Sequence, residues 1–219
     1  KIMNNDLYYY RPDVTAPVAP VLTPSTTDPT NQAVTVTAQF SETDSVKEYS
    51  LDGKVWNSYT DGIGFTDNGT LNFRGQDDAG NWSDVTTYQV INIDKTLPVA
   101  PVASADITSV TNGKVTVSAT FSSDSVVKEY SFDGKSWNSY TAGVEFTANG
   151  TVYFRGQDEA GNWSEATSFT VSNIDTEPPA KPVTAADKTA PTNEVVTVSA
   201  TFSGDSILKE YSFDKENWF

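Results

Sequence analysis

A period of 81 residues runs through the chain without an insertion, and it limits the fold more than any other feature of the sequence. Trp56, Trp137 and Trp218 follow one another at this spacing, and the string FRGQD occurs at 73–77 and again at 154–158. Self-similarity of this length marks a structural unit that is used several times along a chain. The fold of one unit therefore predicts the fold of every copy, and the succession of copies along the chain gives the architecture.

The period also predicts how the chain is divided. Residues 1–12 fit the unit poorly and are predicted to be the end of a preceding domain or a linker. Complete units are expected at 13–93 and 94–174, and a partial third unit at 175–219. Each unit opens with a proline-rich run, such as TLPVAP at 96–101. Because proline fixes φ and removes a backbone donor, these runs indicate short, stiff linkers that lead into a first strand.

Within a unit the hydrophobic pattern is that of β-strands. Val34, Val36 and Ala38 alternate with polar residues, which is the period expected for a half-buried strand. Asp52-Gly53 predicts a tight hairpin turn. No segment keeps the helical period of about 3.6 residues. Seven or so short strands per unit predict an all-β fold, in which tandem immunoglobulin-like antiparallel β-sandwiches are joined by Pro-rich linkers.

The partial third unit, 175–219, holds counterparts of only the first four predicted strands. A lone half of four strands would leave sheet edges and apolar faces open. One explanation is that the sequence is a fragment of a longer protein. The other is that another chain supplies the missing strands by strand addition, for which residues 1–12 offer a single candidate strand.

The composition excludes several kinds of chemistry. The chain has no cysteine and no histidine, so it has no disulfide, no thiol nucleophile and no imidazole base. Phe73 and Phe154 are expected where an immunoglobulin domain has its cysteine on strand F, so apolar packing must replace that bridge. No nucleophile elbow or phosphate-binding loop is present, and the chain is predicted not to be an enzyme.

Charge and hydropathy limit the partners. The formal net charge of −15 opposes binding to nucleic acid and to anionic lipid. No apolar run approaches the roughly 20 residues that span a bilayer. We therefore expect no nucleic-acid partner and no membrane insertion in this segment.

The units resemble the tandem bacterial immunoglobulin-like (Big-type) repeats of large surface adhesins. The resemblance covers residues 13–219 and rests on the Pro-rich starts after Asp13, Asp94 and Asp175, the Asn-Gly-Thr turn, and the DxAGNWS pattern at 77–83. It implies a stalk that lies outside the cell, at the bacterial surface. Neighbouring repeats of the same chain would be its partners, and distal domains would contact a host or cell-surface ligand. In some such adhesins calcium stiffens the joints between repeats.

Acidic residues are predicted to gather at one pole of each unit, where the first strand starts and two loops meet. The candidate Ca²⁺ ligands are Asp13, Asp44, Asp77 and Asp78 in the first unit, Asp94, Asp124, Asp158 and Glu159 in the second, and Asp175 and Asp205 in the third. Calcium takes six to eight oxygen ligands and accepts irregular loops. The alternative is turn chemistry alone, because an Asp that opens a turn bonds its own backbone two residues on. No EF-hand loop is present.

Three functions remain open for this chain. The first is a structural stalk or spacer that projects a distal binding region of an adhesin or surface filament, because reach grows with the number of copies. The second is a carbohydrate- or host-ligand-binding module, in which Trp82 and Trp163 after their turns stack on a sugar ring. The third is an accessory region of a larger extracellular enzyme. An open, flat Trp163 ring would favour the second function, and a ring packed against the protein would argue against it.

Overall fold

The structure is a computed structural model that describes residues 11–219 as β-strands joined by turns and loops. Unit 1 contains β1 (Val21–Pro24), β2 (Val34–Gln39), β3 (Asp44–Ser50), β4 (Asn57–Ser58), β5 (Ile63–Phe65), β6 (Gly69–Asp77) and β7 (Thr86–Val90). Unit 2 contains β8 (Val102–Ala105), β9 (Val115–Thr120), β10 (Val127–Ser131), β11 (Asn138–Ser139), β12 (Val144–Phe146), β13 (Gly150–Gln157) and β14 (Thr167–Val171). Unit 3 contains β15 (Val183–Ala186) and β16 (Val198–Thr201).

Residues 1–10 lie outside the described part of the chain, so the expectation for 1–12 as a preceding domain end or linker stays a prediction. Among residues 11–219 there is no helix with the length and apolar character of a membrane span.

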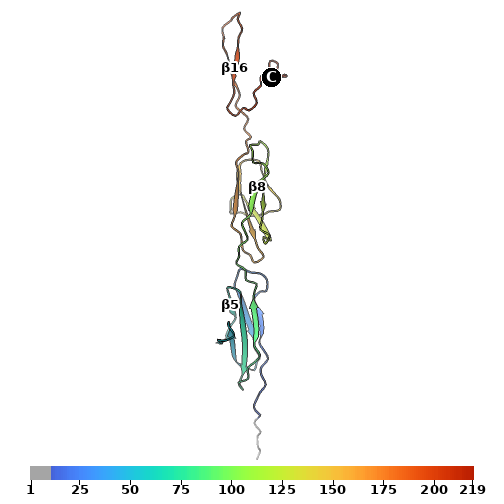
Figure 1. The fold of residues 1–219 in the computed structure, drawn as a ribbon, viewed down its shortest axis with the longest axis vertical. Helices are drawn as coiled ribbons and strands as arrows, with labels where there is room; N and C mark the ends of the chain where they lie inside the picture. The colour runs from blue at the N-terminus through green and yellow to red at the C-terminus, as the bar shows by residue number, and fades with distance from the viewer. Residues whose placement is uncertain (1–10) are drawn as a thin grey trace, which may run out of the picture.

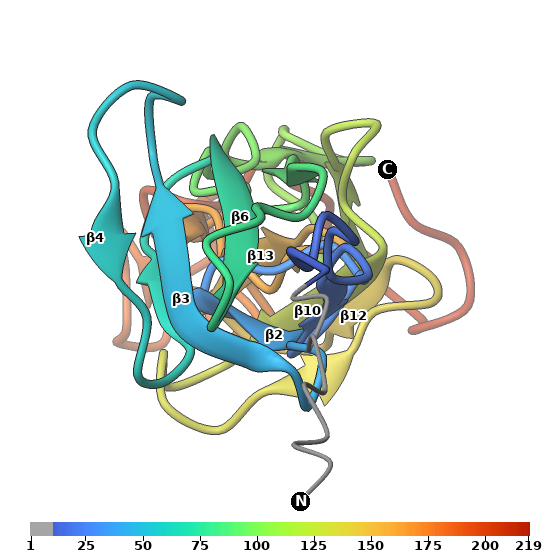
Figure 2. The same ribbon diagram turned by 90° about the horizontal axis from the view of Figure 1, so that it is seen from below.

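Each complete unit is a sandwich of two antiparallel sheets, which confirms the predicted fold class. In unit 1 the strand orders are β1-β2-β5 and β4-β3-β6-β7, and unit 2 repeats them as β8-β9-β12 and β11-β10-β13-β14. Figure 2, which looks along the chain, shows β3 beside its partner β6. The short β4 pairs with β3 at the edge of the larger sheet. Strand D of a constant-type immunoglobulin domain instead joins the sheet that holds the first two strands.

The core of each unit is centred on one phenylalanine. The Phe73 side chain on β6 is fully buried, and its ring packs edge-on against Tyr59 with 5.3 Å between ring centroids. The Tyr59 hydroxyl also accepts a hydrogen bond of 3.0 Å from the backbone N–H of Ala38 on the opposite sheet. Phe154 and Tyr140 repeat the ring contact in unit 2 at 5.5 Å. An aromatic ring thus fills the position of the strand-F cysteine, and apolar packing takes the place of the disulfide, as the sequence predicted.

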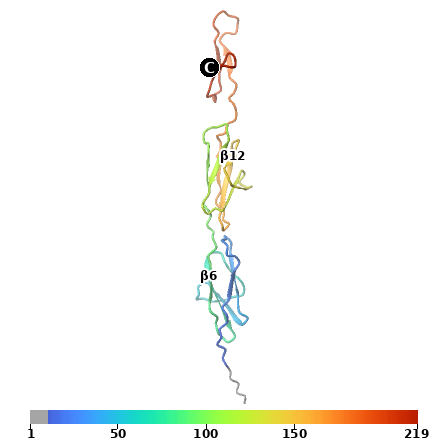
Figure 3. The same cartoon turned by 90° about the vertical axis from the view of Figure 1, so that its right-hand side faces the viewer.

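The units follow one another along the longest axis of the molecule (Figures 1 and 3). In residues 11–219 no strand of one unit pairs with a strand of another. The buried side chains form two separate clusters, one inside each complete unit. The copies therefore share neither a core nor a sheet.

The tight hairpin predicted at Asp52-Gly53 is wrong, because six residues, 51–56, separate β3 from β4. Asp52 opens this loop, and its carboxylate accepts hydrogen bonds from the backbone N–H groups of Lys54 and Val55. Gly53 adopts a φ of 69°, a conformation that glycine adopts without strain. The side chain of Asp52 thus stabilises a wider loop, and this loop carries Trp56 to the outer face of the sheet.

Unit 2 repeats this loop, and it gives a pH prediction. The backbone N–H groups of Ser136 and Lys135 donate to the Asp133 carboxylate and hold its pKa well below the usual value. Because the folded pKa is lowered, this stabilisation is present above the unfolded pKa of about 3.9 and is lost as the pH falls through the folded pKa. We expect Asp133→Asn to lower the melting temperature at neutral pH. The difference in melting temperature between this variant and the parent protein should narrow below about pH 4.

Melting curves recorded across this pH range would test the prediction, with Glu165→Gln, at an exposed carboxylate, as the control that changes little. A gap that keeps its size down to the most acid pH would contradict the role given to the Asp133 carboxylate.

Unit 3 forms fewer strands than the four expected of a half unit. Its first two strands, β15 and β16, pair in the register of β8 and β9. Tyr211 and Phe219 exchange two backbone hydrogen bonds of 3.0 and 2.9 Å, although neither residue lies in a strand. The third strand does not form because its counterpart in unit 2, β10, pairs along its whole length with β13, and 175–219 contains no counterpart of β13.

Candidate functional site at the joint between units

Units 1 and 2 meet at a joint made from three segments: Pro29–Asn31 of unit 1, Asp94 at the start of the linker, and Asp158–Asn162 of unit 2. The backbone N–H of Asn31 donates to the backbone carbonyl of Ala160 over 2.9 Å, which bonds one unit directly to the next. This contact joins a loop between the first two strands of unit 1 to the turn between the last two strands of unit 2.

Asp94 is bonded to both units through its backbone. Its N–H donates to the carbonyl of Thr30 in unit 1 over 2.9 Å. Its carbonyl accepts a hydrogen bond of 3.0 Å from the side-chain amide of Asn162 in unit 2. Together with the bond from Asn31 to Ala160, these two bonds oppose rotation of either unit about the linker.

The turn of unit 2 is prearranged by its own first residue. The Asp158 carboxylate accepts hydrogen bonds from the backbone N–H and the side-chain amide of Asn162, at 2.7 and 2.9 Å. Gly161 adopts a φ of 91°, which closes the turn and which a residue with a Cβ adopts only with strain. In unit 1, Asp77 and Asn81 make the same bonds, and the Asn81 amide is the main cause of a lowered pKa of Asp77.

The two copies of this turn provide an internal comparison. Ala79 in unit 1 is exposed, whereas the equivalent Ala160 in unit 2 is only 8% exposed. Asn81 is half-buried, and the equivalent Asn162 is buried. Because both turns share the hydrogen bonds between their aspartate and asparagine, the extra burial in unit 2 comes from contact with unit 1.

The structure brings most of the predicted calcium ligands to the poles. Asp94, Asp124, Asp158 and Glu159 line one hollow of about 390 Å³ at the joint, together with Pro29. Asp13, Asp77 and Asp78 line the equivalent hollow of about 440 Å³ in unit 1.

The other three predicted ligands lie elsewhere. The Asp44 side chain is buried against Gly75; its Oδ2 accepts from the backbone N–H of Ser41, and its Oδ1 has no partner among the described residues. The backbone N–H of Asp175 donates to Thr111, and Asp205 lies in an exposed loop of unit 3.

These carboxylates do not make a coordination shell in the arrangement described. Oxygen donors of this kind suit calcium. However, no three acidic side chains within residues 11–219 come close enough together to hold a metal ion. The hydrogen bonds of Asp77 and Asp158 are those of turns. Calcium binding therefore stays a prediction of the sequence, and no part of the function below depends on it.

Sequence reasoning missed a second cluster, on the outer face of the larger sheet. The Arg155 guanidinium lies between two indole rings, 4.0 Å from the centroid of Trp137 and 3.9 Å from that of Trp163. It also forms an ion pair of 2.8 Å with Glu129 on the neighbouring strand. Unit 1 repeats the cluster with Arg74, at 4.0 Å from each of its two indoles. The signal was present in the sequence, since the arginine recurs with both tryptophans at the same spacing.

This cluster bears on the sugar-binding hypothesis for Trp82 and Trp163. Each of these rings is half-buried and lies against an arginine. Cation–π contacts of this kind contribute roughly 0.5–2 kcal/mol. One face of the ring is thus used inside the protein, which argues against an open platform for a sugar.

Comparisons with known proteins find similarity to short stretches of large proteinases. No family model matches the chain. It is 41% identical over 93 residues to a PII-type and to a PI-type proteinase of Lactococcus lactis subsp. cremoris, an alignment that covers 41% of this chain and 5% of each proteinase. A PII-type proteinase of Lacticaseibacillus paracasei is 42% identical over 89 residues, which cover 39% of this chain and 4% of that protein.

Among solved structures, the fibronectin(III)-like modules of Clostridium thermocellum CbhA match 71% of this chain and 95% of their own, with 15% identity and a TM-score of 0.33. The chain spans 4 to 5% of the length of the curated relatives it matches, a stretch slightly longer than one unit.

Proposed function

We propose that this chain is a spacer in a large extracellular protein, in which each unit adds length and each joint fixes direction. The observation that supports this most is the pair of bonds at Asp94, one to Thr30 of unit 1 and one to Asn162 of unit 2. A flexible string of sandwiches would need no such contacts. The direct bond between Asn31 and Ala160 has the same effect.

The linkers contribute stiffness of their own. The carboxylate of Asp94 accepts a hydrogen bond of 2.9 Å from the backbone N–H of Thr96. Asp13 and Asp175 make the same bond at the start of their linkers. Each linker therefore begins with a turn closed by aspartate and continues into proline, so few conformations remain to it. The net charge of −15 would keep neighbouring rods apart.

The spacer would lie outside the cell, at a bacterial surface, within one of two kinds of parent protein. The first is an adhesin or surface filament, whose distal domains would contact a host or cell-surface ligand; the resemblance to adhesin repeats supports it. The second is a large extracellular enzyme with an accessory region of this type; the matches to proteinases support it, since the aligned stretch is 4 to 5% of those proteins. The mechanical role of the units is the same in both.

The joint can be tested with an internal control. The chain has no cysteine, so Ser58→Cys and Ser139→Cys, at equivalent exposed positions of units 1 and 2, would accept spin labels selectively. In this background Ala160→Arg places a large charged side chain inside the joint, and we expect the distance distribution measured by pulsed electron resonance to broaden. Ala79→Arg makes the same change in the exposed turn of unit 1 and should leave the distribution narrow.

The proposal fails if the parent distribution is already as broad as that of Ala160→Arg. It also fails if the two arginine variants behave alike. Melting temperatures would be measured alongside, because equal melting of the two variants excludes unfolding of unit 2 as the cause of a difference.

A further inference from the structure

The outer face of the larger sheet in unit 2 carries an arginine cluster that consists of Glu129, Trp137, Arg155 and Trp163. Trp163 directly follows the joint turn, Asp158–Asn162, whose last residue donates its side-chain amide to the carbonyl of Asp94. One member of the cluster thus continues the backbone of the segment that meets unit 1 and its linker.

The backbone bonds hold the joint turn to its own hairpin more than to the sheet. Gln157 and Trp163 form an antiparallel bridge at the base of the turn, and the N–H of Ser164 donates to the carbonyl of Gly156 over 2.8 Å. The ladder between β13 and β10 ends at Gln157, so the turn extends past the sheet. A two-stranded ribbon has little stability of its own. Its direction therefore depends on the side chains that pack against it.

The Arg155 guanidinium packs against this ribbon from the outer face. It lies 3.9 Å from the centroid of the Trp163 ring and 4.0 Å from that of Trp137, in the loop that leads into β11. The strand order β11-β10-β13-β14 places these two rings on opposite sides of β13. Both rings are half-buried, and contacts between a cation and a ring strengthen as water is removed from them. The stack thus ties the ribbon to a loop across the sheet.

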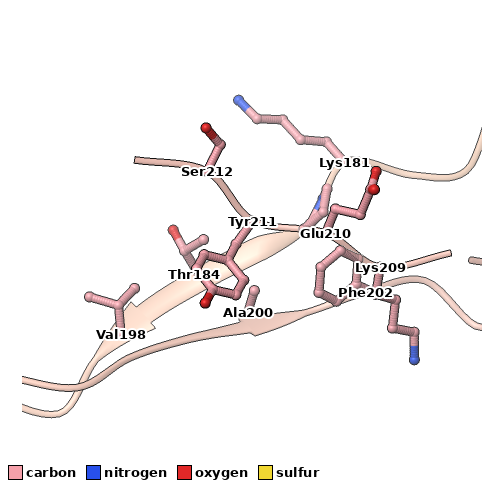
Figure 4. Close-up of a pocket in the computed structure, with 10 residues that line it drawn as sticks. Lys181, Thr184, Val198, Ala200, Phe202, Lys209, Glu210, Tyr211 and Ser212 are labelled. Atoms are coloured by element: carbon pink, nitrogen blue, oxygen red, sulfur yellow. The ribbon is translucent and has the colours of Figure 1, made fainter. Parts of the chain in front are cut away.

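An ion pair fixes the plane of the guanidinium. Nε and Nη2 of Arg155 both donate to one carboxylate oxygen of Glu129, at 2.9 and 2.8 Å. The neighbouring Tyr130 packs against the core, because successive residues of a strand point to opposite faces. Figure 4 shows this alternation at the corresponding residues of unit 3, where Tyr211 points toward the paired strands and Glu210 points away from them. The carboxylate of Glu129 thus stays on the outer face, where it keeps the arginine turned toward both rings.

Unit 1 carries the same cluster beside a turn that meets the preceding linker. The Arg74 guanidinium lies 4.0 Å from the centroids of both its indole rings and pairs with Glu48 over 2.8 Å. The turn beside it contains Asn81, whose amide donates to the carbonyl of Asp13 over 3.2 Å. Because the two clusters have nearly the same geometry, a substitution in unit 1 is a matched control for the same substitution in unit 2.

We propose that Arg155 is a positioning residue for the joint between units 1 and 2. Through Trp163 it sets the direction of the joint turn, so that Ala160 and Asn162 reach their partners in unit 1 and the linker. This role rests on the proposed spacer function, because it explains how the joint of that spacer is kept in place. Stiffness at the joint then depends on a stack whose ion-pair and ring contacts, among the described residues, all lie within unit 2.

Amide hydrogen exchange at Asn31, followed by NMR in the full chain, tests this role. Its backbone N–H belongs to unit 1 but donates to Ala160 of unit 2, so its exchange rate reports opening of the joint. We expect Arg155→Met to speed this exchange about threefold or more, because both ring contacts and the ion pair are lost. Arg155→Lys keeps the charge but has no planar group between the rings, and it should give an intermediate rate. Arg74→Met should leave the rate at Asn31 unchanged, although unit 1 loses the equivalent cluster.

The possible failures can be told apart. If Arg155 only supports the fold of unit 2, Arg155→Met speeds exchange within unit 2 and leaves Asn31 at the parent rate, which would overturn the proposal. Equal acceleration at Asn31 by Arg74→Met would also overturn it. An Asn31 amide that exchanges without protection in the parent chain would mean that the joint does not form, and the spacer function itself would then fail.

Melting temperatures of every variant show whether unit 2 is still folded. If Arg155→Met unfolds unit 2, Trp137→Ala takes its place, because it removes one ring from a loop and leaves the joint turn and the ion pair intact. Trp56→Ala is its control in unit 1. Exchange at Asn31 should again be faster with Trp137→Ala alone, and an unchanged rate would overturn the role given to the stack.

Discussion

Phe154→Ala is expected to destabilise unit 2 strongly and to leave the stability of unit 1 unchanged. The substitution empties the centre of the core, where Phe154 is fully buried against Phe121 and Tyr140. Truncations of this kind cost about 3–5 kcal/mol. That is a large share of the roughly 4–12 kcal/mol of total stability expected for a domain of this length. Unit 1 has its own cluster of buried side chains and loses no core contact.

Calorimetry of the full chain measures this directly, because two units with separate cores give separate transitions. Phe73→Ala is the matched variant and should lower the transition of unit 1 instead. Hydrogen exchange would assign each transition to its unit. If either substitution lowered both transitions equally, the two units would fold as one body, and the picture of independent sandwiches would be wrong.

Gly156→Ala is expected to have the second-largest effect, a loss of about 1–3 kcal/mol of unit 2 stability. A Cβ at Gly156 would clash with the side chain of Ser125, which is buried beneath it. The backbone conformation at Gly156 lies outside the left-handed region, so the cost comes from space alone. Gly64→Ala is the control, because a Cβ there meets no atom within 4 Å.

A double-mutant cycle measures whether this contact is the cause, from the urea midpoint of unit 2. Ser125→Gly removes the obstructing side chain, so Gly156→Ala should cost much less in that background. A cost of Gly156→Ala that stays the same with Ser125→Gly would show that the glycine is needed for another reason.

The sequence alone predicted the fold class because its evidence is local. The alternation at Val34 and Val36 and the lack of a helical period indicate β-strands, whichever strands then pair with one another. The burial of Phe73 follows from its place on a central strand. The tight turn at Asp52-Gly53 was wrong for a reason that the dipeptide cannot show, namely the bonds from Lys54 and Val55 to the Asp52 carboxylate.

The joint was predictable only in part. The pole at which Asp94 and Asp158 would gather followed from strand order, and both line the same hollow. The hydrogen bond from Asn31 to Ala160 could not be predicted in this way, because it joins backbone atoms of two units and no pattern of side chains indicates it. The sequence pattern emphasised the carboxylates, whereas the units are joined by backbone and amide groups.

Small-angle X-ray scattering of the full chain tests the spacer account most directly. A compact globule of this length would have a radius of gyration of about 17 Å. Three units of roughly 30 Å placed end to end, as strand lengths imply, form a rod of about 90 Å, which gives a radius of gyration of about 26 Å and a distance distribution with a long tail. A radius close to that of the globule would show that the copies fold back on one another, and the chain would then set neither reach nor direction.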